Sequence, residues 1–127
     1  MTAIRKLRQQ VVQDFCVRAF GVEHATSLPQ RAVRLLEEAA EAFQAVGGSL
    51  EMAHRCVDVV FSRPIGKLPQ ELGGIGITLL ALAEAAHLDA DAEEQVELDR
   101  ILAKPIEHFT ARNREKNQLG LNTVKAK

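Results

Sequence analysis

The hydrophobic residues of this chain recur at intervals of three and four, which is the spacing of amphipathic α-helices. The first such segment spans residues 4–19 and ends just before a glycine. Ser27 then predicts the start of a second helix as its N-cap, with Pro29 at the first helical position and Gln30 completing a capping box. This second helix should run to about Val46, where a pair of glycines ends it.

Three further helices are predicted over residues 50–62, 69–87 and 89–117, and no segment alternates with the period of a β-strand. Pro105 lies inside the last of them and predicts a kink or a break. Residues 75–83 are apolar on every face, so this helix should be enclosed on all sides, which in a small chain indicates a subunit interface. The pattern therefore predicts an all-α bundle of four to five helices, assembled as a dimer or a dimer of dimers (a homodimer or homotetramer).

Length and charge narrow the class of protein. A chain of 127 residues fits a single domain, which we place at residues 1–119 with a flexible tail at 120–127. The net charge of -1 disfavours a nucleic-acid polymer as partner, because domains that bind one carry a basic excess. The longest apolar stretch is too short to span a bilayer, which argues against a membrane partner, and no signal peptide is visible. We expect a cytoplasmic protein whose Cys16 and Cys56 are reduced and buried.

Three carboxylates gather on the second predicted helix. Glu37, Glu38 and Glu41 lie three and four residues apart, so they share one side of the helix beside its apolar stripe. Like charges at this spacing destabilise a helix by about 0.2–0.5 kcal/mol per pair, and no Lys or Arg follows within a turn. Mg²⁺, which prefers oxygen ligands, would relieve them. The pattern is compatible with a metal site and with a solvated acidic face.

A fourth carboxylate, Glu71, opens the most apolar helix. The helix dipole favours an acidic residue in the first turn by roughly 0.3–1 kcal/mol, and this alone would explain it. Gly73 and Gly74 follow directly, however, and each glycine within a helix costs about 1 kcal/mol relative to alanine. We therefore expect another helix or a ligand to approach closely at this point.

Two acidic runs resemble the signature of the MazG-like all-α nucleoside triphosphate pyrophosphohydrolases: Leu36-Glu37-Glu38-Ala39-Ala40-Glu41 and, on a later helix, Glu71-Leu72-Gly73-Gly74-Ile75. This family is related in fold to phosphoribosyl-ATP pyrophosphohydrolase and the dimeric dUTPases, and the resemblance spans roughly residues 28–88. It implies an enzyme of nucleotide-pool housecleaning that splits a nucleoside triphosphate into monophosphate and pyrophosphate. Glu38, Glu41 and Glu71 would hold Mg²⁺ or Mn²⁺, while Glu37 and Glu38 would serve catalysis, Glu37 by orienting the attacking water.

The chain departs from this family at position 74, where Gly74 stands in place of the signature's second-motif Asp. Glu37 is the nearest possible substitute ligand, and Asp58 on the third predicted helix is another, with a plain surface position as its alternative. Mg²⁺ normally keeps several waters, so a site with one carboxylate fewer can still bind it. The alternative function is a catalytically inactive helical oligomer that binds a nucleotide or a protein.

Basic residues in the last predicted helix supply the opposite charge. At every fourth position they are Lys104, His108, Arg112 and Lys116, which would line one face. Members of the family commonly carry Lys, Arg and Asn in this region, so the resemblance makes Lys104, Arg112, Asn113 and Lys116 candidate ligands of the substrate phosphates. Arg63, in the loop before the fourth predicted helix, is a further candidate or else caps the third helix. A solvated face remains the alternative, since acidic residues interrupt the stripe.

Overall fold

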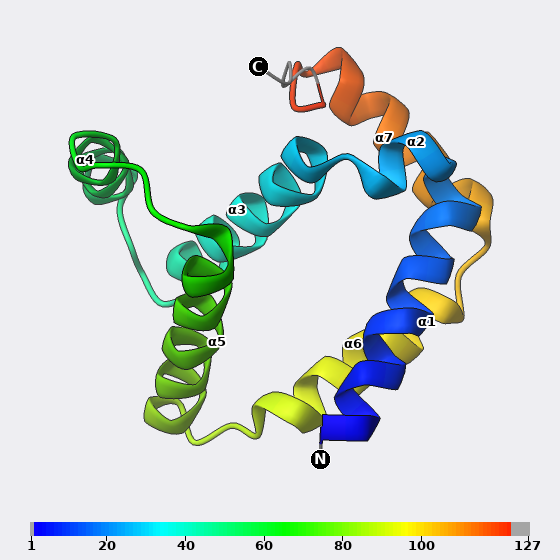
Figure 1. The fold of residues 1–127 in the computed structure, drawn as a ribbon, viewed down its shortest axis with the longest axis horizontal. Helices are drawn as coiled ribbons and strands as arrows, with labels where there is room; N and C mark the ends of the chain where they lie inside the picture. Colours follow the sequence, from blue (N-terminus) through cyan, green and yellow to red (C-terminus); the bar gives the residue numbers. More distant parts are fainter. Residues whose placement is uncertain (1, 123–127) are drawn as a thin grey trace. The chain divides into compact units, whose positions relative to one another are not determined.

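The computed structural model describes residues 2–122, with side chains from residue 4 onward, and this part of the chain is all α-helical: it contains seven helices and no strand. Figure 1 labels them in chain order. Their bounds are α1 Thr2–Phe20, α2 Val22–Thr26, α3 Leu28–Ala45, α4 Leu50–Phe61, α5 Leu68–Ala85, α6 Ala90–Leu102 and α7 Ile106–Gln118. The all-α fold class is thus confirmed.

The helix starts and stops follow local chemistry. Ser27 caps α3 as predicted, because its Oγ accepts a hydrogen bond from the backbone N–H of Gln30 at 3.4 Å. The predicted capping box is not formed, since the Gln30 side chain instead contacts Nδ1 of His24 at 2.7 Å. Ser49 caps α4 through the N–H of Met52 at 3.1 Å. A side-chain oxygen before each of these helices thus satisfies one N–H that the helix leaves unpaired.

The helix count differs from the predicted four to five for two local reasons. Residues 22–26 form one extra turn, α2, which is closed by a hydrogen bond from Thr26 Oγ1 to the carbonyl of Val22 at 2.7 Å. Pro105 breaks the predicted fifth helix into α6 and α7, because proline lacks the N–H and its ring disfavours helix in the residue before it. The break was one of the two outcomes expected there.

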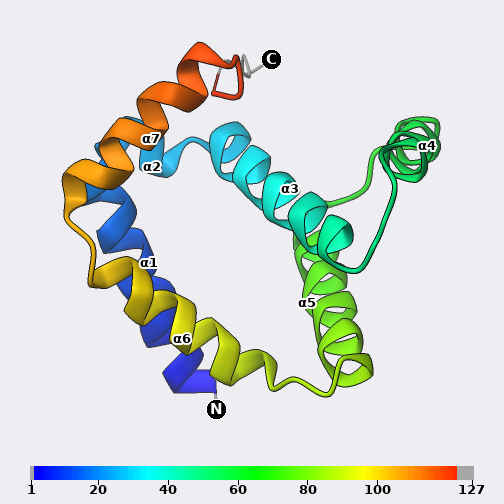
Figure 2. The ribbon, with the colours of Figure 1, turned by 180° about the vertical axis from the view of Figure 1, so that it is seen from behind.

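The chain divides into two units, and each is described here by itself. Unit 1 comprises residues 1–43 and 100–127, and holds a core of Phe15, Cys16, Ala19 and Ala25. The first turns of α7 lie beside the last turns of α1 in both views (Figures 1 and 2). The ring of Phe109 meets that of Phe15 edge-on at 4.9 Å between centroids, and Thr110 Oγ1 donates to the carbonyl of Ala19 at 2.9 Å. A small aromatic core and one cross-helix hydrogen bond therefore join the two ends of the described sequence.

Unit 2 comprises residues 44–99 and has almost no core of its own. Leu98 is its one buried residue, and neither α4 nor α5 contains any. The single chain does not enclose α5, so its enclosure at a subunit interface stays a prediction. The predicted burial of Cys56 is wrong, because this residue is exposed. Cys16 is buried as expected, and both thiols are free.

The predicted tail at 120–127 begins inside the described residues. Gly120 has a left-handed φ of 77°, and the N–H of Leu121 donates to the carbonyl of Lys116 at 2.9 Å. Asn122 is buried, and its side-chain N–H₂ donates to Oδ1 of Asn113 at 2.8 Å. Residues 123–127 lie outside the described part.

Candidate functional site

Helix α3 carries the first acidic run, and Glu37 within it is held by two cations. Its Oε2 lies 2.8 Å from Nη1 of Arg34 and 3.1 Å from Nζ of Lys116. Arg34 precedes Glu37 by three residues, which places both on one helix face, and its Nη2 also donates to the carbonyl of Leu121 at 3.0 Å. Glu37 therefore links α3 to α7 within unit 1.

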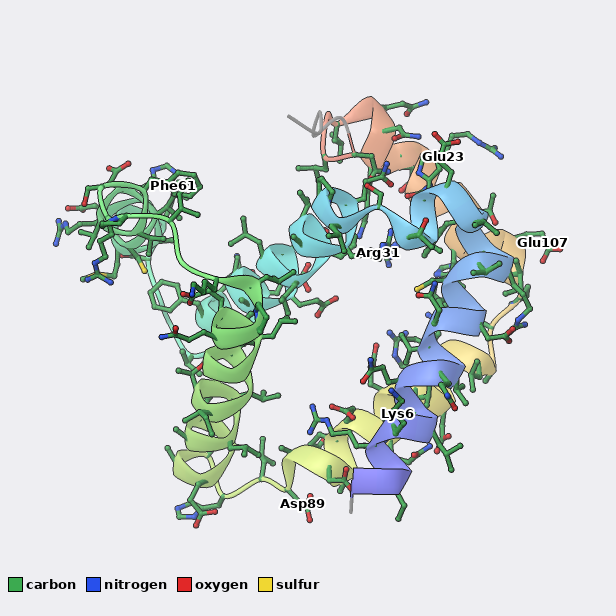
Figure 3. The ribbon with its side chains drawn as sticks, in the orientation of Figure 1. Lys6, Glu23, Arg31, Phe61, Asp89 and Glu107 are labelled. Atoms are coloured by element: carbon green, nitrogen blue, oxygen red, sulfur yellow. The ribbon has the colours of Figure 1, made fainter. Side chains whose placement is uncertain are left out.

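Sequence reasoning missed Arg34. The sequence prediction considered only basic residues that follow the carboxylates in the chain. A residue three positions before a carboxylate lies equally close to it on a helix. Arg31, one turn earlier, was also missed: its guanidinium lies 5.1 Å from the centre of the Phe20 ring and donates to Sγ of Cys16 at 3.8 Å. Figure 3 shows Arg31 near the start of α3. The same spacing rule could have revealed Arg34, but no sequence signal pointed to the contacts of Arg31.

Glu38 and Glu41 differ from Glu37 in having no ion pair within residues 4–122, and both are exposed. Large apolar side chains of the same helix are exposed around them, with Leu36 at 61% and Phe43 at 36%. The predicted apolar stripe of α3 is therefore not covered in the single chain. These two carboxylates sit in a surface that is partly apolar, and their charge is not compensated there.

Glu71 lies in the first turns of α5, in unit 2. Its carboxylate folds back over Gly66, so that a side chain at position 66 would collide with Oε1 of Glu71. The absence of a Cβ at Gly66 thus makes room for this carboxylate. At Gly74 a Cβ would meet nothing within 4 Å, and the same holds at Gly73. The close approach expected at these glycines is therefore not made by any described residue of this chain.

The other predicted residues of unit 2 are exposed. Asp58 lies on α4, and its side chain makes no hydrogen bond or ion pair within the described part of the chain. Arg63 does not cap α4 with its side chain: the last carbonyls accept instead from the N–H of Ser62 and from its Oγ, the latter at 2.6 Å to Val59. Both side chains are thus exposed and available to a ligand.

The predicted basic stripe is only partly formed. His108, Arg112 and Lys116 lie on α7, but Lys104 precedes Pro105 and belongs to the connection between α6 and α7. The break at Pro105 thus removes Lys104 from the common face. Lys116 contacts Glu37, and Asn113 pairs with Asn122, while Arg112 is exposed. Of the predicted phosphate ligands, Lys116 is the one that the structure brings to a predicted catalytic residue.

No cluster of three or more His, Cys, Asp or Glu side chains is arranged around a possible metal position in residues 4–122. Glu38 and Glu41 belong to unit 1 and Glu71 to unit 2. A pocket of about 360 Å³ lies where α5 passes into α6, lined by Leu80, Ala83, Glu84, Leu88, Asp89 and Ala90. It contains none of the predicted site residues.

Among the described helices, none is by itself long and apolar enough to cross a membrane. Helices α5 and α6, with a bend of 102° between them, reach that length and composition only when taken together. Comparisons with family models, with curated proteins and with solved structures found no match to this chain. The resemblance to the MazG-like enzymes accordingly stays a prediction from the two acidic runs.

Proposed function

We propose that this protein is a Mg²⁺-dependent nucleoside triphosphate pyrophosphohydrolase whose site is built on α3. The observation that carries the proposal is the contact between Lys116 and Glu37, 3.1 Å apart, which brings the basic face of α7 to the acidic run of α3 within unit 1. A carboxylate site for a metal and a cationic site for phosphate oxygens would thus adjoin, as hydrolysis of a phosphoanhydride requires.

The donor set of α3 fits a hard divalent cation. Glu38 and Glu41 provide oxygen ligands one turn apart, neither has a cationic partner among the described residues, and exposed apolar side chains surround them. The resemblance alone adds Glu71, from the second acidic run, as a third ligand, with Asp58 as a possible substitute. When bound, Mg²⁺ would neutralise charge on the phosphate oxygens.

The two cations on Glu37 refine the roles of the acidic run. Because Arg34 and Lys116 already engage its carboxylate, Glu37 is suited to hold Lys116 in position beside the substrate phosphates. Glu38 has no ion pair among the described residues, and its carboxylate oxygen that does not bind the metal is suited to take a proton from the attacking water. Arg112, exposed one turn before Lys116, would add a second cation for the phosphates.

The test is release of pyrophosphate from a panel of ribo-, deoxyribo- and modified nucleoside triphosphates with Mg²⁺ or Mn²⁺. We expect activity in the wild type, a loss of at least a hundredfold in Glu38→Gln and Glu41→Gln, and no change in Glu23→Gln. Glu23 is a matched control because it is an exposed carboxylate near the start of α2, outside the acidic runs. A folded wild type that releases no pyrophosphate from any substrate would overturn the proposal.

Position 74 supports a second candidate function, an inactive helical oligomer that binds a nucleotide or a protein. A Cβ at position 74 would meet no atom within 4 Å, and Gly74→Asp restores the second acidic motif. An inactive wild type together with Mg²⁺-dependent activity in Gly74→Asp would identify a site that has lost one ligand. Comparable activity in both proteins would show instead that the site works with a glycine at this position.

A further inference from the structure

Glu37 compensates two cations with a single oxygen atom. Nη1 of Arg34 lies 2.8 Å from its Oε2, and Nζ of Lys116 lies 3.1 Å from the same atom. Neither cation has another anionic partner within residues 4–122, and their side chains are only 18% and 22% exposed. One carboxylate thus faces two partly buried charges, which leaves an excess of positive charge at this contact between α3 and α7.

The contact satisfies Lys116 better than it satisfies Arg34. Nζ of Lys116 donates a hydrogen bond to Glu37. The guanidinium of Arg34 lies at ion-pair distance, but its Nη1 and Nε are buried and make no hydrogen bond within the described part of the chain. Its Nη2 donates to the carbonyl of Leu121 at 3.0 Å. Because a buried N–H without an acceptor is unfavourable, Glu37 leaves hydrogen-bonding capacity of Arg34 unused.

A second guanidinium adds positive charge one turn earlier on α3. Arg31 lies 5.1 Å from the centre of the Phe20 ring, and its other contact is with Sγ of Cys16 at 3.8 Å. Among the described residues no carboxylate forms an ion pair with it. Arg31 and Arg34 are three positions apart, so they lie on neighbouring turns of one helix face. The start of α3 therefore attracts an additional anion.

A phosphate group suits Arg34 and Lys116 better than a carboxylate does. It carries up to about two negative charges and three acceptor oxygens, so separate oxygens can accept from the guanidinium and from the ammonium group. Arginine binds phosphate through two parallel N–H groups, an arrangement that Arg34 does not form with Glu37. The Glu37 side chain is 27% exposed, so its carboxylate has a route to solvent when another anion takes its place.

We propose that Arg34 and Lys116 form a phosphate-binding pair, that Glu37 occupies this pair in the unliganded chain, and that a phosphate group displaces Glu37 on binding. Glu37 then has two opposite effects. It stabilises the free chain by holding both cations in place, and it weakens phosphate binding by competing for them. The inference rests on the proposed function for its natural ligand, the phosphates of a nucleoside triphosphate, but the exchange itself requires no catalysis.

The test measures binding of inorganic pyrophosphate to the full chain without metal, by titration calorimetry at fixed ionic strength. Glu37→Gln removes the competing carboxylate and should tighten binding by about tenfold, although the same change lowers the melting temperature. In the Glu37→Gln background, adding Arg34→Gln or Lys116→Gln should weaken binding by about tenfold or more. A variant that is less stable and yet binds the anion more tightly is the signature of a displaced internal competitor.

Glu51→Gln is the matched control. Glu51 forms an ion pair with Arg55 on α4 at 2.7 Å, so this variant changes the net charge by the same amount and also removes the partner of an arginine. It should leave pyrophosphate binding within about twofold of the wild type, because this pair is exposed. Equal tightening by Glu37→Gln and Glu51→Gln would show that net charge alone governs binding and would overturn the proposal.

Glu37→Asp keeps the proposal testable where Glu37→Gln does not fold. The shorter side chain retains the charge but withdraws the carboxylate by one methylene, so it should tighten binding by less than Glu37→Gln does. Pyrophosphate binding that is equal to or weaker than that of the wild type in both variants would overturn the exchange. It would mean that Glu37 orders the two cations for the anion rather than competing with it.

The exchange and the proposed enzyme can fail separately. A chain that shows this pattern of pyrophosphate binding but releases no pyrophosphate from nucleoside triphosphates would confirm the exchange and overturn the enzyme. An active enzyme in which Glu37→Gln binds pyrophosphate no more tightly than the wild type would overturn the exchange and leave the enzyme standing.

Discussion

Neutralising Glu37 tests whether the acidic run of α3 contains one structural and two free carboxylates. Glu37→Gln leaves Arg34 and Lys116 without their shared anion, although their side chains are only 18% and 22% exposed. Exposed ion pairs contribute about 0–1 kcal/mol, and removing one member of a buried pair costs about 3–5 kcal/mol. Since Glu37 is 27% exposed, we expect a loss of about 1–3 kcal/mol in the free energy of unfolding.

The neighbouring carboxylates provide the internal comparison. Glu38→Gln and Glu41→Gln remove only like-charge repulsion, so they should change stability by less than about 0.5 kcal/mol, or raise it slightly. Unfolding by urea can be followed by circular dichroism, because the chain has no Trp or Tyr to serve as a fluorescent probe. Equal stabilities for Glu37→Gln and Glu41→Gln would refute the distinction.

A double-mutant cycle then separates the two cations. Lys116→Met alone should cost less than Glu37→Gln, because Arg34 still compensates Glu37. The coupling between Glu37→Gln and Lys116→Met should exceed about 0.5 kcal/mol if the two side chains interact directly. Additive effects would mean that the contact contributes nothing to stability.

Three further predictions concern the rest of the chain. Burial raises the pKa of the Cys16 thiol above its ordinary value of 9.0, while the Arg31 guanidinium opposes this through its charge and its hydrogen bond. The unfolded chain therefore loses this proton at lower pH than the folded chain, so the associated stability should be present below pH 9.0 and decline as pH rises above it. Urea titrations between pH 8 and pH 10 should show the decline, and Cys16→Ala should abolish it. His87 has a left-handed φ of 58° at the end of α5, so His87→Gly should stabilise the chain by about 0.5–1 kcal/mol, seen as a raised melting temperature, and a lowered one would refute the strain. Phe109→Ala removes the ring that meets Phe15 at 4.9 Å and should cost about 2–4 kcal/mol in a urea titration, whereas a loss below about 1 kcal/mol would show that this aromatic contact is dispensable.

Local signals in the sequence predicted most of the helices. Ser27 identified the start of α3 and Pro105 the break between α6 and α7, because caps and prolines act on their own backbone within a few residues. The single turn of α2 escaped prediction, since five residues are too few to show a helical period. Apolar periodicity also predicted the α5 helix but not its exposure. The spacing of apolar residues shows which face of a helix is apolar, and it does not show which element packs against that face.

The candidate site was predictable in parts that depend on local spacing. The shared face of Glu37, Glu38 and Glu41 follows from helix geometry. The pairing of Arg34 with Glu37 follows from the same geometry, because the two residues are three positions apart. The contact of Lys116 with Glu37 joins residues 79 positions apart, and no spacing rule reaches that far. The position of the Glu71 carboxylate over Gly66 was predictable only in part. A glycine five residues before Glu71 indicates that a neighbouring group lies close to the backbone, but it does not identify that group.

The pairing of α1 with α7 has a consequence for the order in which the chain can fold during synthesis. A ribosome releases the N-terminal end first, so Phe15 and the carbonyl of Ala19 emerge some ninety residues before Phe109 and Thr110. The core of unit 1 therefore cannot close co-translationally until α7 has left the exit tunnel. In the interval the side of α1 that packs on α7 is uncovered, in addition to the apolar side chains of α4 and α5 that the folded single chain also leaves exposed, and such exposure favours aggregation.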